Sequence, residues 1–246
     1  MSRIIIADPH GCYKTLMALI AQLPAGVPIT FAGDLIDRGP DSRKVIEFVK
    51  SGGYDCVQGN HEVMMVDELK FSKGKDGFEY PSVNGFRGIW TMNGGDKCLK
   101  SYQVEKTPAM DSPVPAAKFY ETDVATLKEH LEWLKSLPYH IEYKDLKNDK
   151  GRHLLVTHTT AGHVWGEMDS SSQGFINSVT WERDPSPPDI KGIYNVYGHT
   201  PQPEKATVRD YFACIDTGAY YKREPYGRMT ALQFPEMKVF TQDNIE

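Results

Sequence analysis

The sequence of 246 residues predicts an α/β protein, on three observations. Six short apolar runs each stop at a polar residue, as buried strands do where they end. Segments whose apolar residues repeat at helical spacing lie between the first three runs. The residues after those runs, Asp8, Asp34 and Asn60, stand at equal intervals of 26 residues. Such intervals suit right-handed crossovers that return the chain to one edge of a sheet.

The first sixty residues predict strand, helix, strand, helix and strand in that order. The strands are the apolar runs that precede Asp8, Asp34 and Asn60. The first helix spans 13–23 and has leucine and isoleucine on one face. The second spans 41–50 and begins with Asp and Ser behind a proline, as helices often do. Ligands of open α/β sheets bind beyond the carboxyl ends of the strands, where these polar residues would meet.

The segment from 63 to about 130 predicts an insertion of helices and loops at one side of the sheet. A helix can continue from His61 to Leu69, after which glycines and prolines interrupt the pattern. An amphipathic helix is expected over 124–137. We expect a single domain over 1–246 that carries this insertion.

The remaining apolar runs stop at His158, His199 and Asp216. They predict three further strands whose last residues reach the same edge. Residues 166–192 are polar and rich in proline, and we expect them to form a long loop. Long loops in compact domains are often functional.

The bulk properties exclude several classes of protein. A net charge of -5 and a pI near 5.9 argue against binding to duplex nucleic acid. The four cysteines show no C-x-x-C spacing, and Cys56 and Cys214 are expected to be buried thiols. Neither a signal peptide nor an apolar stretch of roughly 18 residues occurs, so we expect a cytoplasmic protein without a membrane partner. We also expect a monomer.

The residues that end the strands form one set of metal-ligand side chains. Carboxylate, amide and imidazole suit a hard-to-borderline divalent ion. Six ligands exceed what one catalytic metal takes, so they suit two metals about 3.5–4 Å apart that share a carboxylate and a hydroxide. Two such ions, with the nearby Arg38, would attract phosphate. The six residues are Asp8, His10, Asp34, Asn60, His158 and His199.

The ordered motifs resemble the calcineurin-like metallophosphoesterases over nearly the whole chain. The D-R-G form of the second motif resembles the phosphoprotein phosphatase branch, which includes phage-type and bacterial protein phosphatases and symmetrical diadenosine tetraphosphatases. Trp90, with the Asn-Gly-Gly that follows at 93–95, resembles the insertion of these enzymes more weakly. The motifs are Asp8-Pro9-His10, Gly33-Asp34-Leu35-Ile36-Asp37-Arg38-Gly39, Gly59-Asn60-His61-Glu62, His158 and Gly198-His199-Thr200.

The resemblance implies a β-sandwich of two mixed sheets flanked by helices. It also implies a role for each matching residue. Asp8 and His10 would hold one metal, Asn60, His158 and His199 the other, and Asp34 would bridge the two. His61 would protonate the leaving group, with Asp37 orienting its imidazole. Arg38 and Arg183 would bind the phosphoryl oxygens.

The implied activity is hydrolysis of a phosphomonoester by a hydroxide that bridges the metals and attacks phosphorus directly. Manganese is the expected metal, with iron, zinc or nickel as alternatives. The expected substrate is phosphoserine or phosphothreonine in a protein. The alternative is a dinucleoside tetraphosphate, cleaved symmetrically. A catalytically dead scaffold is disfavoured because every motif residue is present, and a nuclease is disfavoured by the acidic charge and by Arg38.

The remaining histidines and Asp216 have simpler interpretations. His130, His140, His153 and His163 match no motif, and we expect them at the surface. His163 is close enough to His158 in sequence to contact substrate. Asp216 follows the last core strand and is expected to stabilise a turn.

Overall fold

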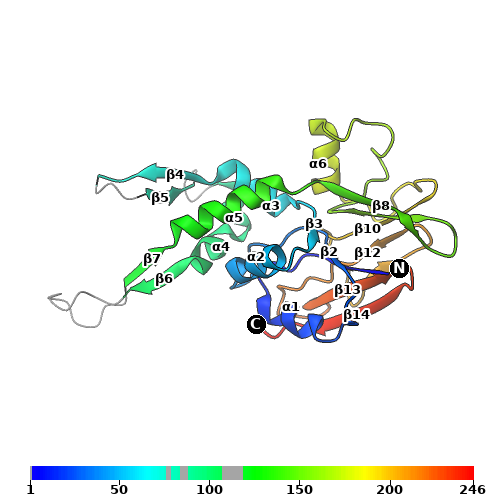
Figure 1. Ribbon diagram of the computed structural model, residues 1–246, viewed down its shortest axis with the longest axis horizontal. Coiled ribbons are helices and arrows are strands. Elements are labelled where there is room, and N and C mark those ends of the chain that lie inside the picture. The colour runs from blue at the N-terminus through cyan, green and yellow to red at the C-terminus, as the bar shows by residue number, and fades with distance from the viewer. Residues whose placement is uncertain (1, 76–78, 84–87, 107–118) are drawn as a thin grey trace.

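The computed structural model describes residues 2–75, 79–83, 88–106 and 119–246. Two five-stranded sheets form its centre, with strand orders β14-β13-β1-β2-β3 and β11-β12-β10-β9-β8. Figure 1 shows the sheets packed together at one end of the molecule, with the helices α3, α4 and α5 beside them toward the other end. The predicted sandwich of two mixed sheets flanked by helices is confirmed.

The first half of the chain supplies three strands of the first sheet and most of the helices. Its elements are β1 (Arg3–Ile6), α1 (Tyr13–Ile20), β2 (Ile29–Phe31), α2 (Ser42–Ser51), β3 (Asp55–Cys56), α3 (Asn60–Glu68), β4 (Lys70–Lys73), β5 (Glu79–Ser82), the π-helix η1 (Thr91–Gly95), α4 (Asp96–Ser101), β6 (Gln103–Lys106), β7 (Phe119–Thr122) and α5 (Val124–Ser136).

The second half supplies the second sheet and completes the first. Its elements are β8 (His140–Lys147), β9 (His153–Thr157), α6 (Gln173–Trp181), β10 (Ile193–Tyr197), β11 (Thr207–Val208), β12 (Phe212–Cys214), β13 (Arg228–Phe234) and β14 (Lys238–Asp243).

The predicted β-α-β-α-β start of the chain is confirmed. Strands β1, β2 and β3 pair in parallel, and β1 also pairs antiparallel with β13. Because side chains alternate along a strand, β1 buries both of its faces. Ile4 and Ile6 pack against the core beneath the helices, whereas Ile5 packs into the core between the two sheets.

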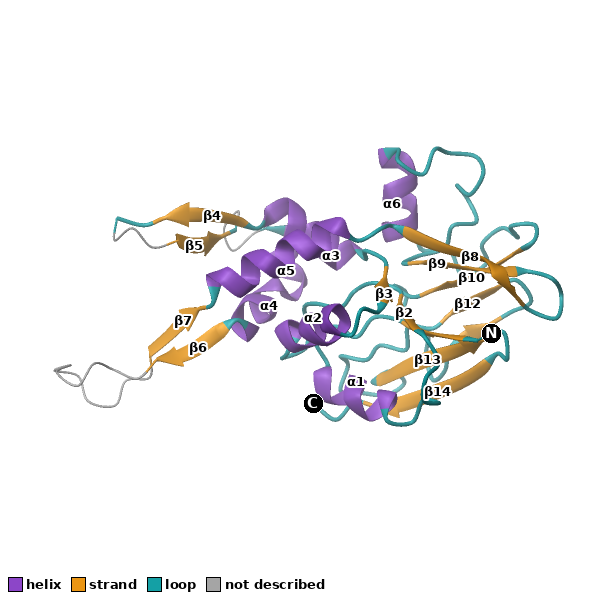
Figure 2. Ribbon diagram, viewed as in Figure 1, coloured by secondary structure: helices purple, strands orange, loops and turns teal. Residues whose placement is uncertain are grey.

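The insertion contains more strand than the sequence indicated. Strands β4 and β5 form one antiparallel pair, and β6 and β7 form another. Figure 2 shows both pairs extending away from the sheets, beyond α3 and α5. The predicted helix over 124–137 is confirmed as α5. Part of the segment from 63 to 130 lies outside the described residues.

Two expectations from the sequence are wrong. The stretch 166–192 is not wholly a loop, because α6 begins after Ser172, whose hydroxyl accepts a hydrogen bond from the Phe175 amide. His130 is buried rather than exposed, since its Nδ1 lies 2.7 Å from the hydroxyl of Tyr102 beneath α5. A polar side chain can lie in the core when a partner satisfies it.

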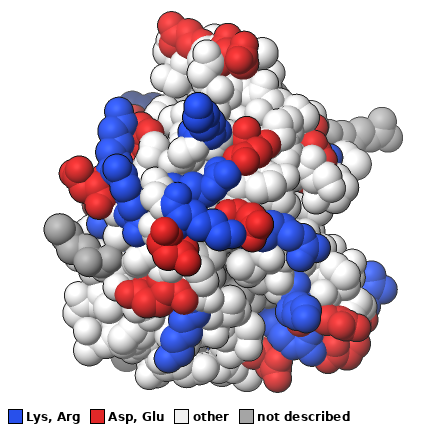
Figure 3. Space-filling view, turned by 90° about the vertical axis from the view of Figure 1, so that its right-hand side faces the viewer, with Lys and Arg blue, Asp and Glu red and all other residues white. Residues whose placement is uncertain are grey.

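The surface carries both signs of charge. Figure 3 shows the face nearest the strands of both sheets, where basic and acidic side chains are intermixed. All four cysteines are free and buried, which confirms the expectation for Cys56 and Cys214. Within the described residues, the helices lack the length and apolar character that crossing a bilayer requires.

Helix α6 covers the outer face of the second sheet through two side chains one turn apart. Phe175 and Val179 are buried against Leu155 of β9. Phe175→Ala should therefore lower the free energy of unfolding by about 3–5 kcal/mol, the usual loss when a buried aromatic ring is removed. Urea denaturation measures this change. Gln173→Ala, at an exposed position of the same helix, should change it by less than about 0.5 kcal/mol. Equal losses in both variants would contradict the assignment.

Candidate active site

The six predicted ligand residues lie beyond the carboxyl ends of strands from both sheets. Asp8 and Asp34 follow β1 and β2, and Asn60 begins α3 directly behind β3. His158 and His199 follow β9 and β10 of the second sheet. All are buried. The two sheets therefore bring together residues that are far apart in sequence.

The carboxylate of Asp34 lies between two groups of imidazoles. Its Oδ2 is 3.5 Å from Nε2 of His10 and 3.8 Å from Nε2 of His61. Its Oδ1 is 3.4 Å from Nε2 of His158. Each oxygen thus faces a different group, which is the arrangement that a bridging carboxylate requires.

The second group contains three ligand atoms close to one another. Oδ1 of Asn60 lies 3.0 Å from Nε2 of His158 and 3.0 Å from Nδ1 of His199. The two ring nitrogens are 3.1 Å apart. Atoms with lone pairs that converge in this way fit the coordination of a cation.

Backbone carbonyls fix which ring nitrogen carries the proton in two of these histidines. Nδ1 of His10 lies 2.8 Å from the carbonyl of Ile36, and Nδ1 of His158 lies 2.8 Å from that of Ala32. A carbonyl can only accept, so Nδ1 is the donor in each ring. Nε2 is left with its lone pair directed into the site, as a metal ligand requires. The donor set therefore fits two divalent ions.

Asp8, unlike Asp34, does not lie between the two groups of imidazoles. Both of its oxygens accept the backbone N–H of His199 at 3.0 Å. The two compact ligand groups are His10, Asp34 and His61, and Asp34, His158 and His199. The structure thus places His61, which the sequence assigns to proton donation, beside His10, and places Asp8 against the backbone of the second sheet.

The surroundings push the pKa values of the histidines in opposite directions. Burial lowers the pKa of His10, His158 and His199, which favours the neutral imidazole that binds metals. Burial also acts to lower the pKa of His61, but Asp34 and then Asp37 raise it above the ordinary value overall. A raised pKa in His61 and lowered pKa values in the other three histidines distinguish a proton donor from metal ligands within one site.

His61 and Asp37 form a buried pair. Nδ1 of His61 lies 2.6 Å from Oδ2 of Asp37, and both side chains are fully buried. Nε2 of His61 has no hydrogen-bond partner among the described residues. The carboxylate fixes the ring so that Nε2 points into the site and is available for a reacting oxygen.

The two predicted arginines contact different ligand residues. Nη1 of Arg38 is 2.8 Å from Nε2 of His10, and its guanidinium stacks 4.6 Å over the ring of Tyr220. Nη1 of Arg183, just beyond α6, donates to the carbonyl of His199 at 3.3 Å. Both positive charges therefore border the site.

The loops that carry the site have an unusual backbone. Most of the described non-glycine residues with positive φ belong to the predicted site. Left-handed conformations are costly for such residues and persist where the surrounding structure enforces them. Gly198 shows how close the loops approach, since a Cβ there would lie 1.8 Å from Oδ2 of Asp8. The site residues with positive φ are Asp8, His10, Asp34, Asp37, Arg38 and His199.

Glu62 belongs to a quoted motif, but sequence reasoning gave it no role. Its buried carboxylate accepts the backbone N–H groups of Asp34 at 2.9 Å, Leu35 at 2.8 Å and Gly59 at 2.8 Å. It thereby holds the turn that presents Asp34 against the start of α3. The signal in the sequence is an acidic residue at the third helical position, which often caps its own helix.

The residues outside the motifs lie in simpler surroundings. His163 is exposed and pairs with Asp184 at 2.7 Å. His153 pairs with Glu142 at 2.7 Å and is partly buried, as is His140. Asp216 accepts the backbone N–H of Gly218 at 2.8 Å, which agrees with its expected place in a turn.

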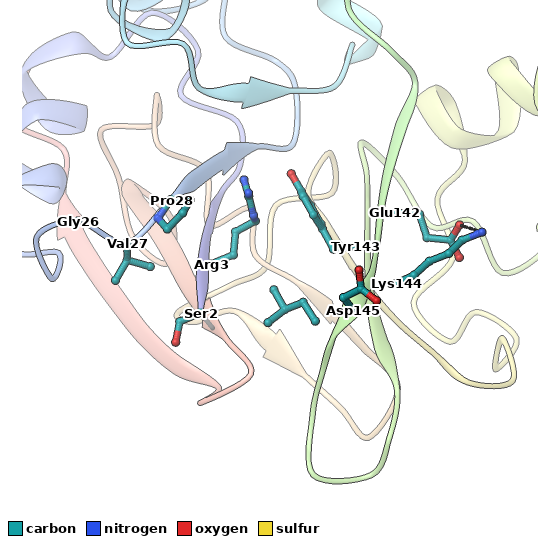
Figure 4. A pocket seen from close by; sticks show the side chains of 10 residues that line it. Ser2, Arg3, Gly26, Val27, Pro28, Glu142, Tyr143, Lys144 and Asp145 are labelled. Atoms are coloured by element: carbon teal, nitrogen blue, oxygen red, sulfur yellow. Dashed lines mark ion pairs between the residues drawn. The ribbon is translucent and has the colours of Figure 1, made fainter.

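A cavity of about 690 Å³ lies elsewhere, between the first residues of β1 and the strand β8. Figure 4 shows Arg3 and Tyr143 directed into it. The guanidinium of Arg3 stacks 4.1 Å over the Tyr143 ring and pairs with Asp55. None of the predicted site residues lines this cavity, so it is distinct from the candidate active site.

Comparison with protein families and relatives agrees with the motifs. Residues 1–203 match the model of the family described as calcineurin-like phosphoesterase. The chain is 30% identical to the asymmetrical bis(5'-nucleosyl)-tetraphosphatase PrpE of Bacillus cereus, over 95% of this chain and 91% of that protein. It is 33% identical to serine/threonine-protein phosphatase 1 of Salmonella typhimurium, over 37% of this chain and 38% of that protein.

Solved structures share the fold at low sequence identity. A protein serine/threonine phosphatase from Saccharomyces cerevisiae superimposes with a TM-score of 0.58 at 12% identity, over 100% of this chain and 81% of that one. A cold-active protein-tyrosine phosphatase from a Shewanella species gives 0.53 at 16% identity, over 94% and 75%. These likenesses support the fold assignment.

The three hydrogen bonds to Glu62 lead to a test of the site's framework. Glu62→Gln replaces one acceptor oxygen with a donor, so at least one backbone N–H loses its partner. The free energy of unfolding should fall by about 1–3 kcal/mol, and Mn²⁺ should bind about 10–100-fold more weakly. Thermal unfolding and calorimetric titration measure the two effects. Glu132→Gln, on the exposed side of α5, should change neither. Unaltered binding in Glu62→Gln would refute a positioning role.

Proposed function

We propose that this chain, which belongs to the calcineurin-like phosphoesterase family, hydrolyses phosphomonoesters at two divalent metal ions, with phosphoserine and phosphothreonine in proteins as the first candidate substrates. The observation that carries the proposal is the position of Asp34. Its two oxygens face two separate groups of ligand atoms, and the His61–Asp37 pair stands beside one of them.

The proposed ligands divide between two ions, as the resemblance implies. Asp8 and His10 would hold one ion, Asn60, His158 and His199 the other, and Asp34 both. When bound, the ions would lower the pKa of a water molecule and neutralise charge on the phosphoryl oxygens. Manganese is our first expectation, because oxygen and imidazole ligands suit it, and iron, zinc and nickel are the alternatives.

The protein's own side chains then act on the ester. Arg38 and Arg183 would bind phosphoryl oxygens, since their planar guanidinium groups match phosphate geometry. His61 would donate the proton on Nε2 to the departing oxygen. Asp37, hydrogen bonded to Nδ1, keeps the ring in the orientation that this transfer requires.

A second candidate substrate is a dinucleoside polyphosphate. The relatives that align over 95% of this chain carry the name of a bis(5'-nucleosyl)-tetraphosphatase, whereas the alignment with the protein phosphatase covers 37%. The proposed ligands and acid suit both substrates, because both reactions displace an oxygen from phosphorus. The name of those relatives specifies asymmetrical cleavage, whereas the alternative expected from the motifs is symmetrical cleavage.

A substrate panel separates the two candidates. We expect the Mn²⁺-loaded protein to hydrolyse a phosphoserine peptide with a kcat/KM at least about tenfold above its value for diadenosine tetraphosphate. Phosphate release measures the first reaction, and chromatography of the nucleotides measures the second and shows where the chain is cut. The reverse ranking would transfer the proposal to the dinucleotide. Full activity after exhaustive chelation would refute the metal-dependent mechanism for either substrate.

The role of His61 can be tested by removing its acidic proton. His61→Asn should lower kcat on the phosphoserine peptide by about 10²–10⁴-fold, the usual contribution of general acid catalysis. The number of Mn²⁺ ions bound should stay the same, because His61 is not a proposed ligand. His163→Asn, at an exposed histidine paired with Asp184, is the matched control and should keep most of the activity. Loss of a metal ion in His61→Asn would instead make His61 a ligand.

A further inference from the structure

The Asp37 carboxylate has a second buried partner besides His61. The indole Nε1 of Trp90 lies 3.0 Å from Oδ1 and 3.0 Å from Oδ2 of Asp37. All three side chains are completely buried. An indole N–H can only donate, so it favours the ionised carboxylate as its acceptor.

Trp90 is fixed by its backbone and by its ring. Its backbone N–H donates to Oε1 of Glu68, the last residue of α3, at 3.2 Å. Its ring packs against Gly95 so closely that a Cβ there would lie 2.6 Å from two ring atoms. The indole therefore has a defined position from which to direct its N–H.

The same segment also holds the turn that contains Asp37. Gly94 has a φ of +104°, and a Cβ there would lie 2.8 Å from the backbone nitrogen of Arg38. Nζ of Lys97 donates to the carbonyl of Arg38 at 2.9 Å. The insertion thus contacts both Asp37 and Arg38.

Asp37 needs such a donor because it is buried without an arginine or lysine as its hydrogen-bond partner among the described residues. Burial raises its pKa overall, and the hydrogen bonds from His61 and Trp90 partly oppose that rise. A carboxylate that turned about its bond to Cβ would lose its alignment with Nδ1 of His61. The indole N–H opposes that rotation because it contacts both oxygens at equal distance.

We propose that Trp90 is a positioning residue for the reaction: its indole N–H holds the Asp37 carboxylate in line with His61, so that Nε2 of His61 meets the leaving oxygen. This inference rests on the proposed function. It predicts that replacing Trp90 lowers kcat most for esters whose leaving oxygen needs a proton. An alkyl ester needs protonation of its leaving group, whereas p-nitrophenolate leaves as an anion.

The kinetic test compares two esters in two variants of the Mn²⁺-loaded protein. Trp90→Phe keeps an aromatic ring and removes the N–H. It should lower kcat on a phosphoserine peptide by about tenfold or more and kcat on p-nitrophenyl phosphate by less than about threefold. Tyr102→Phe is the matched control, because Tyr102 is equally buried in the same core but bonds to His130, away from the site. It should lower kcat on both esters by the same small factor.

A spectroscopic test reports the hydrogen bond without turnover. The indole N–H resonance of Trp90 is assigned in the metal-free protein by its absence from the spectrum of Trp90→Phe. Asp37→Asn removes the carboxylate charge and should move this resonance upfield, while those of Trp133, Trp165 and Trp181 stay in place. If Trp90→Phe fails to fold, benzothienylalanine at this position replaces N–H with sulfur in a ring of nearly the same shape, and the kinetic comparison is made with that protein.

The outcomes separate this inference from the proposed function. Equal losses of kcat on the two esters in Trp90→Phe would show a purely structural role for Trp90. An indole resonance that Asp37→Asn does not move would show that the hydrogen bond is absent. Either result overturns the inference. If the wild-type protein hydrolyses neither ester, the proposed function fails, and the resonance alone decides whether Trp90 holds Asp37.

Discussion

The carboxylate of Asp34 is the group around which the site is assembled. It lies between imidazoles that reach it from both sheets, at 3.5 Å from His10 and 3.4 Å from His158. A buried anion is costly unless partners compensate it, and here the compensation comes from histidines and from the backbone N–H of His61, which donates to Oδ1 at 3.1 Å. The packing of the two sheets and the charge of the site therefore depend on each other.

Tight turns allow so many polar groups to meet in a small volume. Asp8, Asp34 and His199 lie two or three residues beyond the ends of β1, β2 and β10, and each has a left-handed backbone conformation. The strain in these turns is offset by the apolar strands behind them, whose side chains are buried on both faces. A rigid framework thus holds a local arrangement that would be unstable alone.

Much of this structure could be predicted from the sequence, and the exceptions have physical causes. Apolar runs that end at polar residues located β1, β2, β3, β9, β10 and β12, and the helical spacing of apolar residues located α1, α2 and α5. Helix α6 was missed because its apolar contacts are only Phe175 and Val179 in a polar stretch. His130 and Trp90 depend on partners 28 and 53 residues away, Tyr102 and Asp37, and no local pattern reveals such pairings. The left-handed backbone of the site also leaves no signature in residues that are not glycine.

The pairing of β1 with β13 has a consequence for how the chain folds as it is made. Strand β1 lies between β2 and β13, and β13, which begins at Arg228, is synthesised much later than β1. Ile5, which faces the second sheet, packs in a core whose other members are mostly made later, so its side chain cannot be buried there until they emerge. During synthesis the early β-α-β-α-β unit therefore keeps an unpaired, apolar strand edge until β13 has been made. An exposed edge of this kind is a site for aggregation and for chaperone binding.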